Sequence, residues 1–126
     1  MSPTQRTRDW LKSRGITSQI VERWNAHARV RQDLFGFADL LAIHARIVAI
    51  QVTSGGNVAA RVEKIYAEPN AREWLAAGGL IEVHGWRKLT MRTKTGKLSK
   101  AKRWALRRVA VECDGTGAMI SREIAE

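Results

Sequence analysis

Two apolar segments near the middle of the chain, residues 37–43 and 47–53, constrain its fold most strongly. Each is interrupted by a polar side chain, Asp39 in the first and Gln51 in the second. Apolar residues on both faces of a short segment are typical of central strands that are buried on two sides. Because only residues 44–46 separate the two segments, we expect them to pair as a hairpin.

Flanking segments carry helix and strand signals. Before the hairpin we expect a helix from Ser2–Pro3 to Gly15, then a second helix from Thr17 or Ser18 with Ile20, Val21 and Trp24 on one face, and strand character from residue 30. After the hairpin strands we expect a helix that follows Asn57 and a further helical piece from Pro69 to Gly78–Gly79. Two more strands are expected at residues 80–86 and 104–111. This αβββαβ order predicts a single α/β domain over residues 1–126, with a mixed sheet flanked by helices.

Positive charge is concentrated in one C-terminal segment. The chain has 22 basic and 12 acidic residues and a net charge of +10. Residues 87–108 contain ten basic residues and no acid, which accounts for the whole excess: Arg87, Lys88, Arg92, Lys94, Lys97, Lys100, Lys102, Arg103, Arg107 and Arg108. We expect residues 87–126 to form a basic extension with a hairpin loop at 91–101 that binds a polyanion. A solvated face that keeps the protein soluble is the alternative; a membrane surface is disfavoured because the segment has no apolar stripe.

The aromatic residues and the single cysteine add little chemistry. We expect Trp10, Trp24 and Trp74 in the core, and core packing rather than base stacking also for Trp86 and Trp104, which flank the basic segment. The cysteine excludes an internal disulfide, and the histidines have no zinc-ligand spacing. With no apolar run of about 18 residues and no apolar N-terminal stretch, the sequence favours a cytoplasmic protein.

The polar residues of the central hairpin form a candidate site. Gln51 and Thr53 lie two residues apart, so they project from one face of their strand. Asp39 joins them if the neighbouring strand is antiparallel and in a suitable register. A buried acid is costly unless it is hydrogen-bonded, paired or bound to a metal.

These residues carry a family resemblance. Gly36-Phe37-Ala38-Asp39, then Gln51-Val52-Thr53 on a second strand, then a helix and a strand, resemble the core of PD-(D/E)xK nucleases over about residues 17–86. The branches most similar are phage-type and Holliday-junction-resolvase-like (VRR-NUC-like). The resemblance implies a restriction-endonuclease-like fold, a cytoplasm of bacterial or phage-infected cells, branched or structured DNA as substrate, and a homodimer.

The resemblance also implies functional roles for individual residues. Asp39 and the residue at position 51 would hold Mg²⁺, or Mn²⁺ in its place, with help from the Val52 carbonyl and from Glu22 on the first helix. This chain departs from the family pattern in two places, because Gln51 replaces the second acid and Thr53 replaces the lysine. Glutamine still offers a carbonyl oxygen to a hard cation.

The departures require further charges nearby. Asp33 or Glu22 would add negative charge at the metal, and Lys64 or Arg61 would supply the missing cation. Each also has a plain structural interpretation: Asp39 as a hydrogen-bonded strand acid, Glu22 as a solvated side chain, Asp33 as a turn cap, and Lys64 as a surface lysine.

The expected function is therefore a Mg²⁺-dependent endodeoxyribonuclease. Asp39, Gln51 and Val52 would bind the metal, Thr53 would position water, and Lys64 would stabilise charge on the phosphate. The alternatives are a catalytically inactive DNA-binding protein that retains the nuclease fold, and a basic domain that binds RNA.

Overall fold

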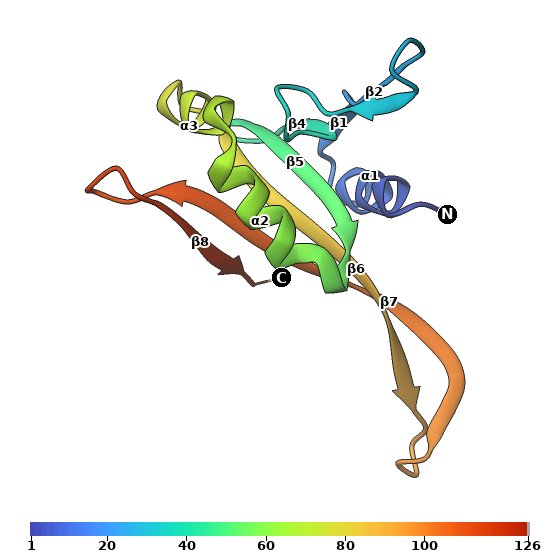
Figure 1. Ribbon diagram of the computed structural model, residues 1–126. Helices are drawn as coiled ribbons and strands as arrows, with labels where there is room; N and C mark the ends of the chain where they lie inside the picture. Colours follow the sequence, from blue (N-terminus) through green and yellow to red (C-terminus); the bar gives the residue numbers. More distant parts are fainter. Residues whose placement is uncertain (126) are drawn as a thin grey trace.

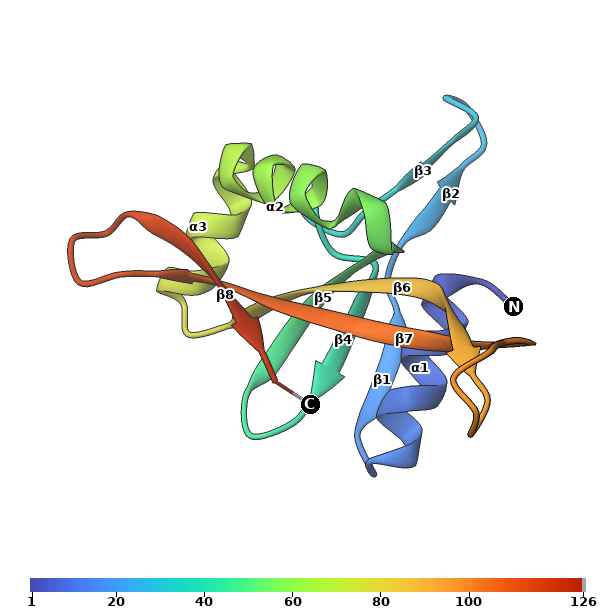
Figure 2. The same ribbon diagram turned by 90° about the horizontal axis from the view of Figure 1, so that it is seen from below.

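The computed structural model describes residues 1–125 and shows a six-stranded mixed sheet with helices on both faces, together with a small two-stranded sheet (Figures 1 and 2). Its elements, in chain order, are α1 (Pro3–Ser13), β1 (Thr17–Ile20), β2 (Arg23–Asn25), β3 (Val30–Gln32), β4 (Leu40–Ile43), β5 (Ile47–Ser54), the 3₁₀ turn η1 (Gly55–Asn57), α2 (Val58–Ala67), α3 (Pro69–Ala76), β6 (Leu80–Arg92), β7 (Leu98–Cys113) and β8 (Met119–Ile124). The predicted mixed α/β architecture is confirmed.

The sheet is built outward from the β4–β5 hairpin. Its strand order is β1-β4-β5-β6-β7-β8; β5 and β6 run parallel, and all other neighbours are antiparallel. In the predicted hairpin, Leu40 pairs with Ile50 and Ile43 with Ile47. Residues 48–53 are all buried, as expected for a strand covered on both faces.

Alternate residues of β5 face two separate cores. Val48, Ile50 and Val52 pack with Leu11 of α1 on one face. On the other face, Ala49 packs with residues of α2 and α3, among them Ile65. Figure 2 shows α2 and α3 on one side of the sheet and α1 on the other. By the same alternation, Gln51 and Thr53 belong to the α2 side.

The helix expected from Thr17 or Ser18 is wrong. Residues 17–20 form β1, which pairs with β4, and β2 and β3 form a separate two-stranded ribbon. The β-branched residues here suit a strand as well as a helix, and only the strand covers the otherwise unpaired edge of β4. Trp24 is consequently 59% exposed rather than in the core.

The loop expected at residues 91–101 is largely strand. β6 continues to Arg92 and β7 starts at Leu98, so only residues 93–97 form the turn. This β6–β7 arm extends beyond the rest of the sheet (Figure 1). β8, which the sequence analysis did not predict, returns along β7 and forms the edge of the sheet.

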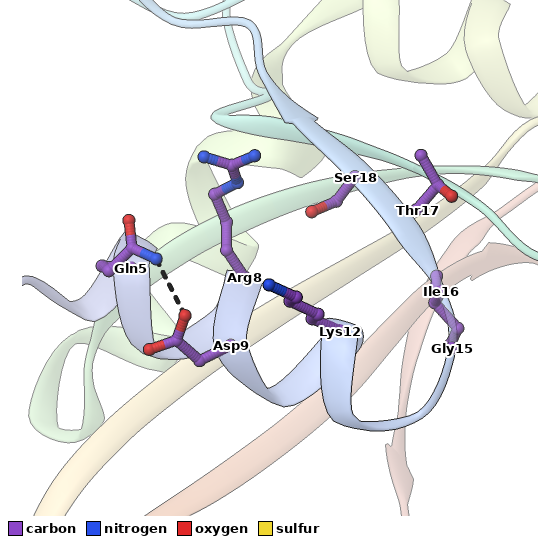
Figure 3. A pocket seen from close by; sticks show the side chains of 8 residues that line it. All are labelled: Gln5, Arg8, Asp9, Lys12, Gly15, Ile16, Thr17 and Ser18. Atoms are coloured by element: carbon purple, nitrogen blue, oxygen red, sulfur yellow. Dashed lines mark hydrogen bonds between the residues drawn. The ribbon is translucent and has the colours of Figure 1, made fainter.

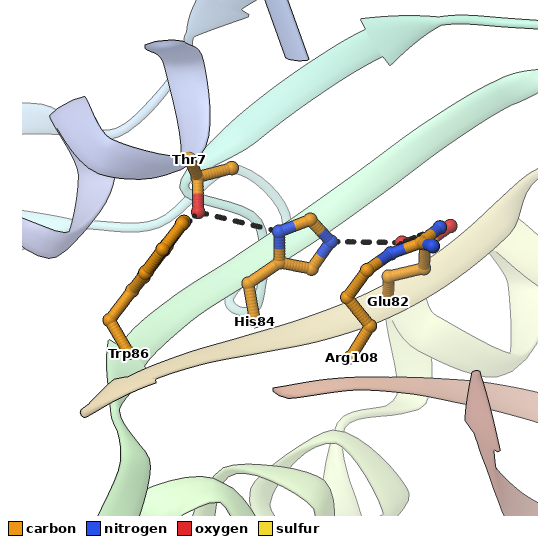
Figure 4. A network of polar contacts seen from close by, with 5 residues as sticks. All are labelled: Thr7, Glu82, His84, Trp86 and Arg108. Carbon is orange, nitrogen blue, oxygen red and sulfur yellow. Dashed lines mark hydrogen bonds and ion pairs between the residues drawn. The ribbon is translucent and has the colours of Figure 1, made fainter. Parts of the chain in front are cut away.

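A buried polar network fastens α1 to the sheet (Figure 4). The Thr7 hydroxyl accepts a hydrogen bond from Trp86 Nε1 at 2.8 Å and lies 3.3 Å from His84 Nδ1. His84 Nε2 contacts Glu82, which also accepts from Arg108 at 3.0 Å. Because burial and Arg108 keep the pKa of His84 below its ordinary value, the neutral ring serves here as a structural link.

Candidate functional site

A pocket of about 390 Å³ lies on the α2 side of the sheet, where β4 begins and β5 nears its end. It draws residues from α1, the base of the β2–β3 ribbon, β5 and α2. Its lining residues are Thr4, Glu22, Arg31, Asp33, Gly36, Asp39, Gln51, Val52, Arg61 and Lys64. The structure therefore brings together most of the side chains that the sequence analysis selected.

Asp39 lies at the centre of the site and is only 4% exposed. Its backbone N–H donates to the Ile50 carbonyl at 2.9 Å, which extends the β4–β5 pairing by one residue. Its Oδ2 accepts from the Val52 N–H at 2.8 Å and from Gln51 Nε2 at 2.5 Å. The predicted convergence of Asp39 and Gln51 on one side of the hairpin is present.

Gln51 has an acceptor that nothing satisfies. The residue is 1% exposed, and its Oε1 has no hydrogen-bond partner among the described residues. Buried carbonyl oxygens are nearly always paired, so an orphan of this kind points to a missing ligand. Since the amide nitrogen is engaged by Asp39, the oxygen is the atom left for a cation.

The Val52 carbonyl lies on the same side of β5 as this cluster. In a strand, the N–H and C=O of one residue point to the same edge. The Val52 N–H points to Asp39, so its carbonyl also points towards the β4 edge.

Two further acids approach Asp39. Carboxylate oxygens of Glu22, Asp33 and Asp39 lie within 4.8 Å of one another. Glu22 lies in the link between β1 and β2, rather than on a helix as expected, and Asp33 directly follows β3. The base of the β2–β3 ribbon thus delivers both acids.

A tight turn holds Asp33 and Asp39 at its two ends. Leu34 and Ala38 bridge across it, with N···O distances of 2.9 and 3.0 Å. Phe35 and Gly36 have φ of 55° and 83°, and a Cβ at position 36 would lie 2.6 Å from the Glu68 carboxylate. The positive φ at position 36 favours glycine, and a side chain there would also displace the Glu68 carboxylate.

The acids hold a proton in the absence of a cation. Burial raises the pKa of Asp39 to about 8, helped by a hydrogen bond to Asp33 and by the negative charges of Asp33 and Glu22. The Val52 N–H lowers this pKa but does not outweigh the burial. A divalent cation would replace the proton and compensate the three carboxylates. Carboxylates and one amide oxygen are a donor set that fits Mg²⁺ or Mn²⁺.

Three cations border the acids. Lys64 Nζ lies 3.1 Å from Asp33 Oδ2, and Arg31 approaches Glu22 at 3.8 Å. Arg61 lines the same pocket from α2. Gly85 allows α2 to pack closely on β6, since a Cβ at this position would lie 2.3 Å from the Val58 side chain. Arg31 and Thr4 are pocket residues that the sequence analysis missed, since only the fold brings them to Asp39.

Thr53 is not brought to this pocket. It lies two residues beyond Gln51 on the same face of β5 and is 5% exposed, but it does not line the pocket. Of the expected site residues, Lys64 is therefore better placed than Thr53 to act near the acids.

The ten basic residues of the C-terminal segment divide into two sets. Arg107 pairs with Glu123 across β8, and Arg108 pairs with Glu82 inside the polar network. The other eight are exposed on the β6–β7 arm: Arg87, Lys88, Arg92, Lys94, Lys97, Lys100, Lys102 and Arg103. Within this segment, the cations without an acidic partner among the described residues are therefore those of the arm.

A second pocket, of about 490 Å³, lies between α1 and β1 (Figure 3). Arg8 and Lys12 enter it, and its only acid, Asp9, accepts a hydrogen bond from Gln5 at 2.9 Å. With two cations and one occupied acid, this pocket is unsuited to a metal ion.

Comparisons with known proteins return no match among family models, curated proteins or solved structures. Among residues 1–125, no helix is long and apolar enough to cross a membrane.

The raised pKa of Asp39 makes a prediction about stability. Between about pH 4 and pH 8 the folded protein keeps a proton that the unfolded chain has released, so stability should fall as pH rises. Asp39→Asn stays neutral and should lose this dependence. In EDTA at pH 8 we expect the variant to be more stable than the wild type by roughly 2 kcal/mol or more, and near pH 4 about equal.

Urea denaturation across this pH range checks the prediction, with the exposed Asp9→Asn as the matched control. If the difference in free energy of unfolding between the wild type and Asp39→Asn is the same at every pH, the prediction is contradicted.

Proposed function

We propose that this chain is a divalent-metal-dependent endodeoxyribonuclease with a restriction-endonuclease-like core of the PD-(D/E)xK type. The observation that supports it most is the unpaired Gln51 Oε1, buried beside Asp39 and next to two more carboxylates. A purely structural strand acid would not require an unsatisfied oxygen and three acids in one pocket. The resemblance of residues 36–53 to that nuclease core points the same way.

Asp39, the Gln51 Oε1 and the Val52 carbonyl would hold the ion, and Glu22 and Asp33 would add the negative charge that glutamine lacks. Mg²⁺ bound there would polarise the phosphate and lower the pKa of a bound water. Asp33 holds the Lys64 ammonium at the pocket rim, where it would neutralise charge that develops on the phosphate. Arg61 would assist from the same helix. Thr53 keeps no direct role in this scheme.

The β6–β7 arm would provide affinity for DNA. Its eight exposed cations are spread along both strands and the turn of a hairpin. Side chains of this kind bind phosphates without reading sequence. The arm and the pocket thus divide the work between binding and hydrolysis.

An inactive DNA-binding protein is the second candidate. Two features favour it: position 51 carries no charge, and the nearest lysine, Lys64, is already paired with Asp33. In this case the protein retains the fold and the arm, and the pocket that holds Glu22, Asp33 and Asp39 (the acid pocket) has no catalytic use.

Cleavage assays separate the two candidates. With Mg²⁺ or Mn²⁺, we expect the wild type to cut at least one of linear, nicked, flapped and four-way DNA. Asp39→Ala should reduce the rate by about 100-fold or more, because it removes the central ligand. Glu63→Gln, on α2 but outside the pocket lining, should cut like the wild type. Binding without cutting on all four substrates would support the inactive alternative.

The arm makes a separate prediction about salt. Replacing Lys94, Lys97, Lys100 and Lys102 with Gln should weaken DNA binding on every sequence, because each lysine bound to a phosphate releases counterions. The slope of log K against log salt should become less steep by about 0.9 for each phosphate that the variant no longer neutralises. Fluorescence anisotropy at several salt concentrations measures this slope. A slope equal to that of the wild type would show that the arm does not bind the phosphates.

A further inference from the structure

The β2–β3 hairpin (residues 23–32) projects from the core as a second arm (Figures 1 and 2). In Figure 1 the hairpin extends upwards and the β6–β7 arm downwards, both from the end of the molecule where α1 begins. It contains Arg23, Arg29 and Arg31, all exposed, and no acid. Its two strands pair only with each other, and of the three arginines only Arg31 has an acidic partner among the described residues.

Trp24 is the most exposed of the five tryptophans, with 59% of its surface accessible. Trp104, on the other arm, is 40% exposed but has the Arg6 guanidinium 3.8 Å from its ring centroid. Within residues 1–125, no cation or aromatic ring stacks on Trp24 in this way. A large apolar ring is thus left available for a ligand.

The strand register directs Trp24 to the side of the acid pocket. Trp24 pairs directly with Arg31 across the hairpin, and directly paired residues of antiparallel strands project from the same face. Arg31 lines the acid pocket and contacts Glu22. The Trp24 ring and the pocket rim therefore belong to one surface.

We propose that the β2–β3 hairpin recognises an unpaired base of DNA, with Trp24 as the stacking surface. This inference rests on the proposed function and adds a substrate class: DNA in which a nucleotide beside the cut is unpaired. Only an unstacked base exposes its face to an aromatic side chain, whereas bases inside a duplex are covered by their neighbours. Arg29, in the turn of the hairpin, binds a phosphate of the same strand, and Arg31, paired with Glu22, holds the hairpin base at the pocket.

Nucleic acid fits this surface better than a second copy of the chain. Two copies of the hairpin would bring like charges together, because residues 23–32 contain three arginines and no acid, and only Arg31 has an acidic partner, Glu22, which lies outside the hairpin. A DNA strand supplies the negative charge that the hairpin lacks and the flat base faces that can stack on Trp24.

The two arms then have different tasks. The β6–β7 arm binds any phosphodiester backbone, and the β2–β3 hairpin selects for an unpaired base. The acid pocket lies at the base of the hairpin that makes this selection.

Binding measured without cleavage tests the proposal. Full-length protein in Ca²⁺ is titrated against a blunt duplex and against a fork of the same length with single-stranded ends. Trp24→Ala should reduce affinity for the fork by about tenfold and affinity for the duplex by less than about twofold. Trp24→Phe should retain most of the fork affinity. Val30→Ala is the matched control, because Val30 is exposed on the opposite face of the same hairpin, and it should bind both substrates like the wild type.

Three results would overturn the proposal: equally weakened binding of fork and duplex, unchanged binding of both, or conversion of a dimer into a monomer by Trp24→Ala in light scattering. These results are independent of hydrolysis. A fork-selective defect in a protein that never cuts would refute the nuclease and retain the hairpin's role. If the wild type cuts DNA but Trp24→Ala shows no fork-selective loss of binding, the nuclease function is retained and the proposed role of the hairpin is refuted.

Discussion

Burial of the Asp39 carboxylate is the constraint around which this protein is organised. Its Oδ2 is held by the Val52 N–H and by the Gln51 amide, which leaves the Gln51 oxygen buried and unpaired. Placing two more acids within 4.8 Å adds repulsion to the cost of burial. Such an arrangement destabilises the fold unless a proton or a cation neutralises it, and sites of this kind are typical of function rather than of packing.

The architecture serves this pocket. The β4–β5 hairpin fixes Asp39 and Gln51 in the most buried part of the sheet, and the β2–β3 ribbon brings Glu22 and Asp33 to them from outside it. α2 adds Lys64 and Arg61 from the face of the sheet that it covers. Rigid central strands thus hold the residues that must not move, and the two projecting arms carry the exposed cations that would meet a long polyanion.

Much of this could be predicted from sequence because it is local. The two-sided apolar runs identified the central hairpin, and the polar residues that interrupt them identified Asp39 and Gln51. The Ser2 cap accepts from the Gln5 N–H at 3.1 Å, and Pro69 starts α3 as expected. Helix caps and turn residues act over three or four positions, which is the range that a sequence pattern describes.

The errors concern interactions between distant segments. Residues 17–25 suit either a helix or strands, and the free edge of β4 decides between them. The ladder of β6 and β7 continues through the expected loop, since each pair of residues supports the next. Arg108 joins Glu82, and Arg31 reaches the acid pocket, only because the fold brings them there. An unpaired oxygen on Gln51 likewise has no signature in sequence.

Manganese binding tests the central claim most directly. Titration calorimetry of the wild type should show one Mn²⁺ bound per chain, with about one proton released near pH 7, because the pKa of Asp39 is about 8 before binding. Affinity should rise with pH up to that value, and Asp39→Asn should bind no ion at this site. Binding that is independent of pH and unaffected by Asp39→Asn would show that the acid pocket is not the metal site.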